Sequence, residues 1–247
     1  MIGFIVWQEK TAGKRQRSVA LREESVLHMR FMKAEVLRGE KTPEAVLRRR
    51  VLAAGKRLRK LGIPRAVLPE SFPYRDVLML CGLQGISTLA LRRSLAADWL
   101  RWELEKKGLS PVTGRIAVSA DQLTGELVRT VTEVVLRHRY VLLDIPYGGE
   151  DLSRQLRREY GVSLLLNPDK EQLEGADALI LFGAREDLSC RNPVVLPLYD
   201  ETVALPEFSL PPAIEERLPA GADRTQLVAA LREAGALRPG QITFLHK

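Results

Sequence analysis

Short apolar runs alternate with amphipathic helical segments between residues 114 and 183. The apolar runs cover residues 115–119, 140–145, 162–166 and 178–182, and helical patterns separate them. Strands that are apolar on both faces and alternate with helices are typical of a parallel sheet covered by helices on both sides. The pattern therefore predicts the α/β class, with a mostly parallel sheet.

The rest of the chain extends this organisation. A strand is expected over 2–7, a helix over 43–61, a short strand over 65–68 and a long helix over about 88–107. Residues 18–37 fit either a hairpin or, as we favour for the second half, a helix from Ser25 to Arg38. We expect a basic N-terminal α/β half over 1–109 and a second α/β half over 114–200. Proline-rich residues 201–247 are expected to end in a helix that packs back on the sheet.

In this alternation of elements the chain resembles Rossmann-like and flavodoxin-like proteins. The resemblance covers residues 114–183 well and the remainder loosely. It implies either two α/β lobes or two halves of one continuous sheet. Since many unrelated activities share these folds, the resemblance implies no particular function.

Positive charge is concentrated in one segment. The chain carries a formal net charge of +7, and residues 10–60 hold 16 Lys and Arg against 5 Asp and Glu. Localised positive charge attracts nucleic acid or an acidic protein surface. The expected contact residues lie on the helix over 43–61, and they are Arg48, Arg49, Lys56 and Arg57. No base-reading motif accompanies them, so binding would be electrostatic and sensitive to salt.

Ligands of open parallel sheets bind beyond the carboxyl ends of the strands, which directs attention to the turns there. The turn after residues 115–119 has Ser119 and Asp121 where a dinucleotide fingerprint has glycines. A classical NAD or FAD site is therefore disfavoured. We expect Ser119 or Asp121 to cap a helix over 122–138.

The turn after the next strand contains Asp144, Gly148 and Gly149. Two glycines before a helix expose backbone N–H groups that can bind an anion. Asp144 is placed to contact a sugar hydroxyl or to act as an acid or base. Together with Ser119 and Asp121, these residues are the predicted contacts of a small anionic ligand. Arg185, after the fourth strand, is expected to be a solvated loop residue.

No set of residues typical of catalysis or metal binding assembles in the sequence. There is no P-loop, no nucleophile elbow and no His or Cys cluster with metal-ligand spacing. Cys81 and Cys190 are expected to be free thiols in the cytoplasm, and no membrane segment is expected. We therefore expect a protein that binds a ligand or partner without recognisable catalytic machinery. The alternatives are an enzyme acting on a nucleotide-like or phosphorylated small molecule, and electrostatic binding through residues 10–60.

Overall fold

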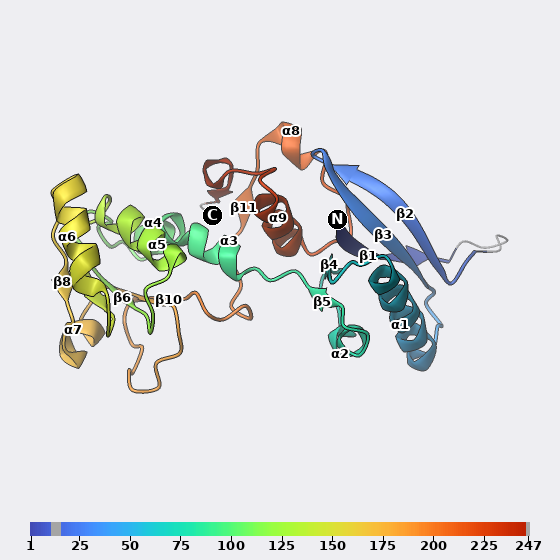
Figure 1. Cartoon of the computed structure of the whole chain (residues 1–247), viewed down its shortest axis with the longest axis horizontal. Helices are drawn as coiled ribbons and strands as arrows, with labels where there is room; N and C mark the ends of the chain where they lie inside the picture. The colour runs from blue at the N-terminus through green and yellow to red at the C-terminus, as the bar shows by residue number, and fades with distance from the viewer. Residues whose placement is uncertain (11–15, 246–247) are drawn as a thin grey trace. The chain divides into compact units, whose positions relative to one another are not determined.

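The computed structural model describes residues 1–10 and 16–245, which form two compact units with separate sheets (Figure 1). Unit 1 comprises Met1–Thr88 and Leu210–Ile242, and unit 2 comprises Leu89–Ser209 and Thr243–Lys247. The expectation of an α/β protein with mostly parallel sheets is confirmed, and each unit carries its own five-stranded sheet flanked by helices. The domain ranges expected from the sequence stay predictions.

Sheet A of unit 1 is mostly parallel, with strand order β2-β3-β1-β4-β5. Only the β2–β3 pair is antiparallel among its described pairs. Its strands are β1 (Ile2–Glu9), β2 (Val19–Val26), β3 (Met29–Arg38), β4 (Arg65–Val67) and β5 (Gln84–Gly85). The helices of this unit are α1 (Glu44–Lys60), α2 (Arg75–Met79), α8 (Pro212–Glu215), α9 (Arg224–Glu233) and the 3₁₀ turn η1 (Pro239–Gln241).

The helix favoured over Ser25 to Arg38 is wrong, because strands β2 and β3 form a hairpin there. Val26 pairs with Met29, and the two residues between them, Leu27 and His28, have φ of 48° and 69°. Two-residue hairpin turns that need positive φ usually contain Asn or Gly. Leu27 and His28 are not residues typical of such turns. The apolar residues around them are spaced as in a helix, which is why the sequence favours a helix there.

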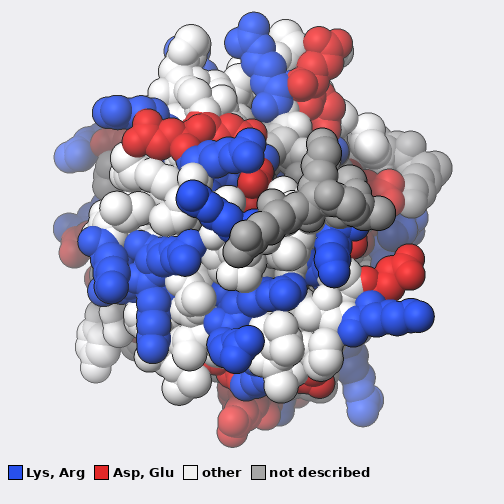
Figure 2. Space-filling view, turned by 90° about the vertical axis from the view of Figure 1, so that its right-hand side faces the viewer, with Lys and Arg blue, Asp and Glu red and all other residues white. Residues whose placement is uncertain are grey.

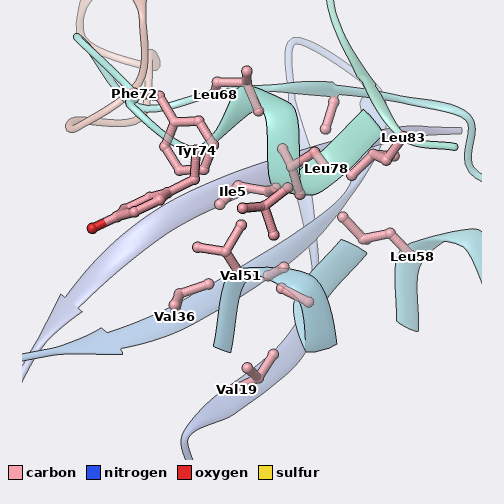
Figure 3. Packing of buried hydrophobic residues seen from close by; sticks show 14 of the residues in the cluster. Ile5, Val19, Val36, Val51, Leu58, Leu68, Phe72, Tyr74, Leu78 and Leu83 are labelled. Atoms are coloured by element: carbon pink, nitrogen blue, oxygen red, sulfur yellow. The ribbon is translucent and has the colours of Figure 1, made fainter. Parts of the chain in front are cut away.

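One face of sheet A is covered by α1, and the contact forms the core of unit 1 (Figure 3). The α1 side chains of Val51 and Leu58 are fully buried against Ile5 of β1 and Val36 of β3. Apolar residues at spacings of three and four give a helix one buried stripe, which is the arrangement expected for this segment.

Helix α9 contacts β4 within the same unit. The backbone N–H of Leu68 donates to Gln226 Oε1 over 3.1 Å, and the Leu68 carbonyl accepts from the Asp223 N–H over 2.8 Å. Arg65 also makes two hydrogen bonds to the carboxylate of Glu233, of 2.7 and 3.0 Å. The C-terminal helix is thereby fixed to a strand more than 150 positions earlier in the chain.

Sheet B of unit 2 is parallel throughout, with strand order β10-β9-β6-β7-β8. Its strands are β6 (Arg115–Ser119), β7 (Tyr140–Asp144), β8 (Leu165–Leu166), β9 (Ala178–Leu181) and β10 (Val194–Pro197). The unit's helices are α3 (Leu89–Ser94), α4 (Ala96–Lys106), α5 (Gly125–Val135), α6 (Gly149–Tyr160) and α7 (Lys170–Glu174), and β11 (Phe208–Ser209) pairs with β12 (Thr243–Phe244).

The order of sheet B positions a ligand site. From β6 the chain moves to β7 and β8 on one side, and then returns to β9 on the other side. The direction of winding therefore reverses between β6 and β9, which is the point where Rossmann-like sheets open a crevice.

Two expected elements of unit 2 differ in length. The single helix expected over 88–107 is two helices, α3 and α4, which Leu95 separates. The third strand, expected over 162–166, is limited to Leu165–Leu166. Within the described residues, no helix is both long and apolar enough to span a lipid bilayer.

Candidate functional site

Three side chains from neighbouring strand ends meet at the carboxyl edge of sheet B. Ser119 ends β6, Asp144 ends β7 and Arg185 follows β9. The Ser119 hydroxyl donates to Asp144 Oδ2 over 3.0 Å, and Arg185 Nη1 donates to Ser119 Oγ over 2.5 Å and to Asp144 Oδ2. Parallel register places Ser119 directly beside Asp144, so the cluster follows from the strand pairing. We call Ser119, Asp144 and Arg185 the strand-end cluster.

Arg185 is held in this cluster by a second carboxylate. Its Nε and Nη2 donate to the two carboxylate oxygens of Asp187 over 2.8 and 2.9 Å. The paired hydrogen bonds lower the pKa of Asp187 to about 2, and the contacts with Asp187 and Asp144 raise the pKa of Arg185. A fork-shaped guanidinium suits such two-point pairing, which fixes its orientation. Arg185 is therefore a permanently charged and oriented donor.

The turn after β6 adds another carboxylate to this edge. A Cβ built on Gly183 would lie 2.6 Å from Asp121 Oδ2, so Asp121 is close to the end of β9. The expectation that Ser119 or Asp121 caps the next helix is wrong. Thr124 is the N-cap, its hydroxyl accepting from the Leu127 N–H over 3.2 Å, and the helix begins at Gly125.

The glycine pair lies at the start of α6, as the sequence indicated. Gly148 is the N-cap with φ of +81°, a conformation that favours glycine, and it provides no capping side chain. A Cβ at Gly149 would lie 2.9 Å from Ile145, so this glycine permits close packing against the end of β7. Glu150 and Asp151 occupy the first turn of the helix and complement its positive end. These carboxylates disfavour phosphate at this turn.

The charges of this edge define what it can recognise. Arg185 contacts the carboxylates of Asp144 and Asp187. Further negative charge comes from the turn after β6, with Asp121, and from the first turn of α6 after β7, with Glu150 and Asp151. Carboxylates accept hydrogen bonds from hydroxyl and amino groups and repel phosphates. The arrangement therefore suits a neutral ligand rich in hydroxyl groups better than a phosphorylated one.

The sequence predicts Ser119 and Asp144 as site residues, whereas Arg185 is expected to be a solvated loop residue. This expectation for Arg185 is wrong, because its side chain is only 24% exposed and contacts both Ser119 and Asp144. The sequence feature that points to Arg185 is its position after β9, the strand that lies beside β6 where the winding of the sheet reverses.

The predicted basic contacts of unit 1 fall into two groups. Arg48 forms an ion pair of 2.5 Å with Asp76, which lowers the pKa of that carboxyl, and Arg57 donates to the Val19 carbonyl over 2.7 Å. Arg49 and Lys56 are exposed on α1. Lys and Arg side chains gather on the face viewed from the α1 and β2 end (Figure 2).

The described residues include no group of three His, Cys, Asp or Glu side chains placed to hold a metal ion. Cys81 and Cys190 are both free and partly buried. His138 is buried, and one of its ring nitrogens, Nδ1, forms a hydrogen bond with the Pro111 carbonyl.

No protein-family model and no curated protein matches this sequence. Among solved structures, L-tryptophan dehydrogenase from Nostoc punctiforme is 13% identical over 61% of this chain and 44% of its own, with a TM-score of 0.27. Shikimate 5-dehydrogenase from Listeria monocytogenes is 9% identical over 60% of this chain and 58% of its own, with a TM-score of 0.27.

The catalytic subunit of aspartate transcarbamoylase from M. jannaschii is similar over more of the chain. It is 12% identical over 82% of this chain and 77% of its own, with a TM-score of 0.34. This chain spans less than two thirds of the length of each of the two dehydrogenases. Likeness at this level assigns neither an activity nor a ligand, so the function is argued from the residues of the chain itself.

Proposed function

We propose that this protein binds a small hydroxyl-rich molecule, a nucleoside or a sugar, at the carboxyl edge of sheet B. The observation that carries the proposal is the strand-end cluster, in which Ser119, Asp144 and Arg185 converge where the winding of the sheet reverses. Ligands of parallel α/β sheets bind at this point. Asp144 would accept hydrogen bonds from ligand hydroxyls, and Arg185 would donate to a carbonyl or hydroxyl oxygen.

The same residues support binding in preference to catalysis or dinucleotide recognition. The Asp144 carboxylate is already paired with Arg185, so it is suited to accept hydrogen bonds from a ligand rather than to act as a free base. Asp121 and the acidic first turn of α6 oppose a pyrophosphate. The small anion and the phosphorylated substrate expected from the sequence stay predictions, and the charges at this edge favour a neutral ligand.

Calorimetric titration with adenosine, ribose and NAD⁺ tests the proposal. We expect adenosine or ribose to bind more tightly than NAD⁺, because the dinucleotide brings two phosphates to an acidic edge. Asp144→Asn should weaken binding by about tenfold or more, since a hydrogen bond to a charged group contributes about 1.5–3 kcal/mol. Ser119→Ala, a smaller change, should weaken it less.

The matched control is Glu159→Gln, because Glu159 lies near the C-terminal end of α6, away from the acidic first turn of that helix, and its side chain is 39% exposed. It removes the same charge outside the candidate site and should leave the affinity unchanged. Tighter binding of NAD⁺ than of adenosine, or equal loss in Asp144→Asn and Glu159→Gln, would contradict the proposal.

A second function is supported by the exposed cations of α1. We propose that this face also binds polyanions electrostatically, as the gathering of Lys and Arg side chains in Figure 2 favours. The double variant Arg49→Gln/Lys56→Gln should elute from heparin at lower salt than the parent protein, because each phosphate-like contact steepens the salt dependence. Arg154→Gln/Arg158→Gln removes equal charge from exposed sites on α6 and is the control. Equal shifts in the two variants would assign retention to net charge alone.

A further inference from the structure

A pocket separate from the strand-end cluster lies at the opposite, N-terminal end of strands β6 and β7. Its volume is about 440 Å³, and Arg115 and Tyr140, the first residues of β6 and β7, contribute to its lining. These two residues are partners in the strand register, and Leu142 pairs with Leu165 on the edge strand β8. The size falls within the range of pockets that hold small organic ligands.

The pocket exists because this face of sheet B is only partly covered. Helix α7, the crossover between β8 and β9, has five residues, and its Leu173 packs with Leu142 and Leu179. Beyond this short helix, the side chains of Tyr140 and Leu165 are 50% and 49% exposed. Half-exposed apolar surface beside a packed core can receive the apolar body of a ligand.

The charged side chains that line the pocket are both arginines. Arg115 and Arg139 both line the pocket, and the lining residues that the structure describes include no Asp or Glu. Asp177 lies close to Arg115 but accepts from its backbone N–H over 2.7 Å. The Arg139 guanidinium lies 5.5 Å from the centre of the Tyr140 ring. Within the described part of the chain, neither guanidinium has a carboxylate within ion-pair distance.

Gln172 completes the donor set through the cap of α7. Its Oε1 accepts from the Asp169 N–H over 3.0 Å, while Asp169 accepts from the Gln172 N–H over 2.7 Å. This reciprocal capping box fixes the amide and occupies its oxygen. Because Gln172 also lines the pocket, its NH₂ group is the part left to serve a ligand, and it is a donor.

We propose that this pocket binds a small organic anion, with its carboxylate or phosphate group between Arg115 and Arg139 and its planar body against Tyr140, Leu142 and Leu165. The Arg115 and Arg139 guanidiniums, which form no ion pair with a carboxylate of residues 1–10 or 16–245, supply charge-assisted hydrogen bonds, and the exposed tyrosine ring supplies a stacking surface. The site is separate from the strand-end cluster and does not depend on it.

Titrations of the whole chain, followed by amide and side-chain chemical shifts, test this site. The probes are indole-3-acetate, phenyl phosphate and the uncharged indole-3-ethanol. We expect saturable shifts at Tyr140, Leu165 and Gln172 with at least one of the two anions and at least tenfold weaker binding of indole-3-ethanol. The preference between indole-3-acetate and phenyl phosphate identifies the anionic group.

Arg139→Gln and Arg115→Gln should each lower the affinity for the preferred anion at least fivefold. Arg158→Gln, whose side chain is 81% exposed on α6, is the charge-matched control and should change the affinity less than twofold. Equal binding of indole-3-ethanol, equal loss in the control, or the absence of saturable shifts would overturn the proposal. Concentration-dependent broadening at β8 without any probe would also overturn it, because it would show a second copy of the chain on this face.

Discussion

At the scale of single residues, Gly148 shows how a backbone requirement determines the identity of a residue beside the candidate site. Gly148→Ala places a Cβ on a residue with φ of +81° and within 2.8 Å of the Leu123 side chain. The left-handed conformation costs a non-glycine residue about 1–2 kcal/mol, and the flexible Leu123 can move. We expect a loss of that size in the free energy of unfolding, measured by denaturant titration.

Gly125→Ala is the control for this substitution. Gly125 begins α5, and a Cβ there meets no atom within 4 Å among the described residues. Alanine is the better helix former, so this variant should be neutral or more stable than the parent by up to about 1 kcal/mol. Equal destabilisation by the two variants would show that the conformation of Gly148 is not what requires glycine.

His138 predicts a pH dependence of stability. Burial lowers its pKa below the ordinary value of 6.5, so the unfolded chain binds a proton at a higher pH than the folded chain. Stability attributable to His138 is therefore constant above about pH 6.5 and falls as the pH drops from there toward the lower pKa of the folded state.

Melting temperatures measured between pH 5 and pH 8 test this assignment. His138→Gln should flatten the decrease between pH 6.5 and pH 5 relative to the parent. His28→Asn, in the exposed β2–β3 turn and at a positive φ that Asn tolerates, should retain the decrease. An unchanged decrease in His138→Gln would assign it to other groups.

At the scale of elements, the helix over 43–61 could be predicted in type and in its buried face because its apolar residues recur at a helical period. The strands of sheet B could be predicted because short apolar runs alternate there with helical segments. The β2–β3 hairpin could not, because Leu27 and His28 adopt positive φ without the usual turn residues. Strand pairing and long-range contacts determine such an element, and one sequence does not show them.

The buried stripe of α1 gives a prediction for this element. Leu58→Ala removes a fully buried side chain from the core in Figure 3 and should reduce the stability of unit 1 by about 2–5 kcal/mol. Leu61→Ala, at a residue that is 53% exposed just after the helix, should change it by less than about 1 kcal/mol. Hydrogen exchange of amides in β1 and β3 measures the stability of unit 1. Similar losses of stability in Leu58→Ala and Leu61→Ala would show that this core is not well packed.

At the scale of the whole molecule, each unit brings distant parts of the chain together. The strand-end cluster joins residues 119, 144 and 185, and α9 joins β4 across more than 150 positions. The sequence indicated the edge of sheet B and two of the three cluster residues. It did not indicate the charge pairing of Arg185 or the pocket at Arg115 and Arg139, because both depend on strand order.

Titration of the intact protein with adenosine, followed by amide chemical shifts, locates a bound nucleoside directly. A ligand site at the carboxyl edge of sheet B predicts saturable shifts concentrated at residues 119–121, 144–149 and 183–187, and their loss in Asp144→Asn. Saturable shifts confined to other parts of unit 2 or to unit 1, or the absence of any saturable shift with adenosine and ribose, would contradict a ligand site at the carboxyl edge of sheet B.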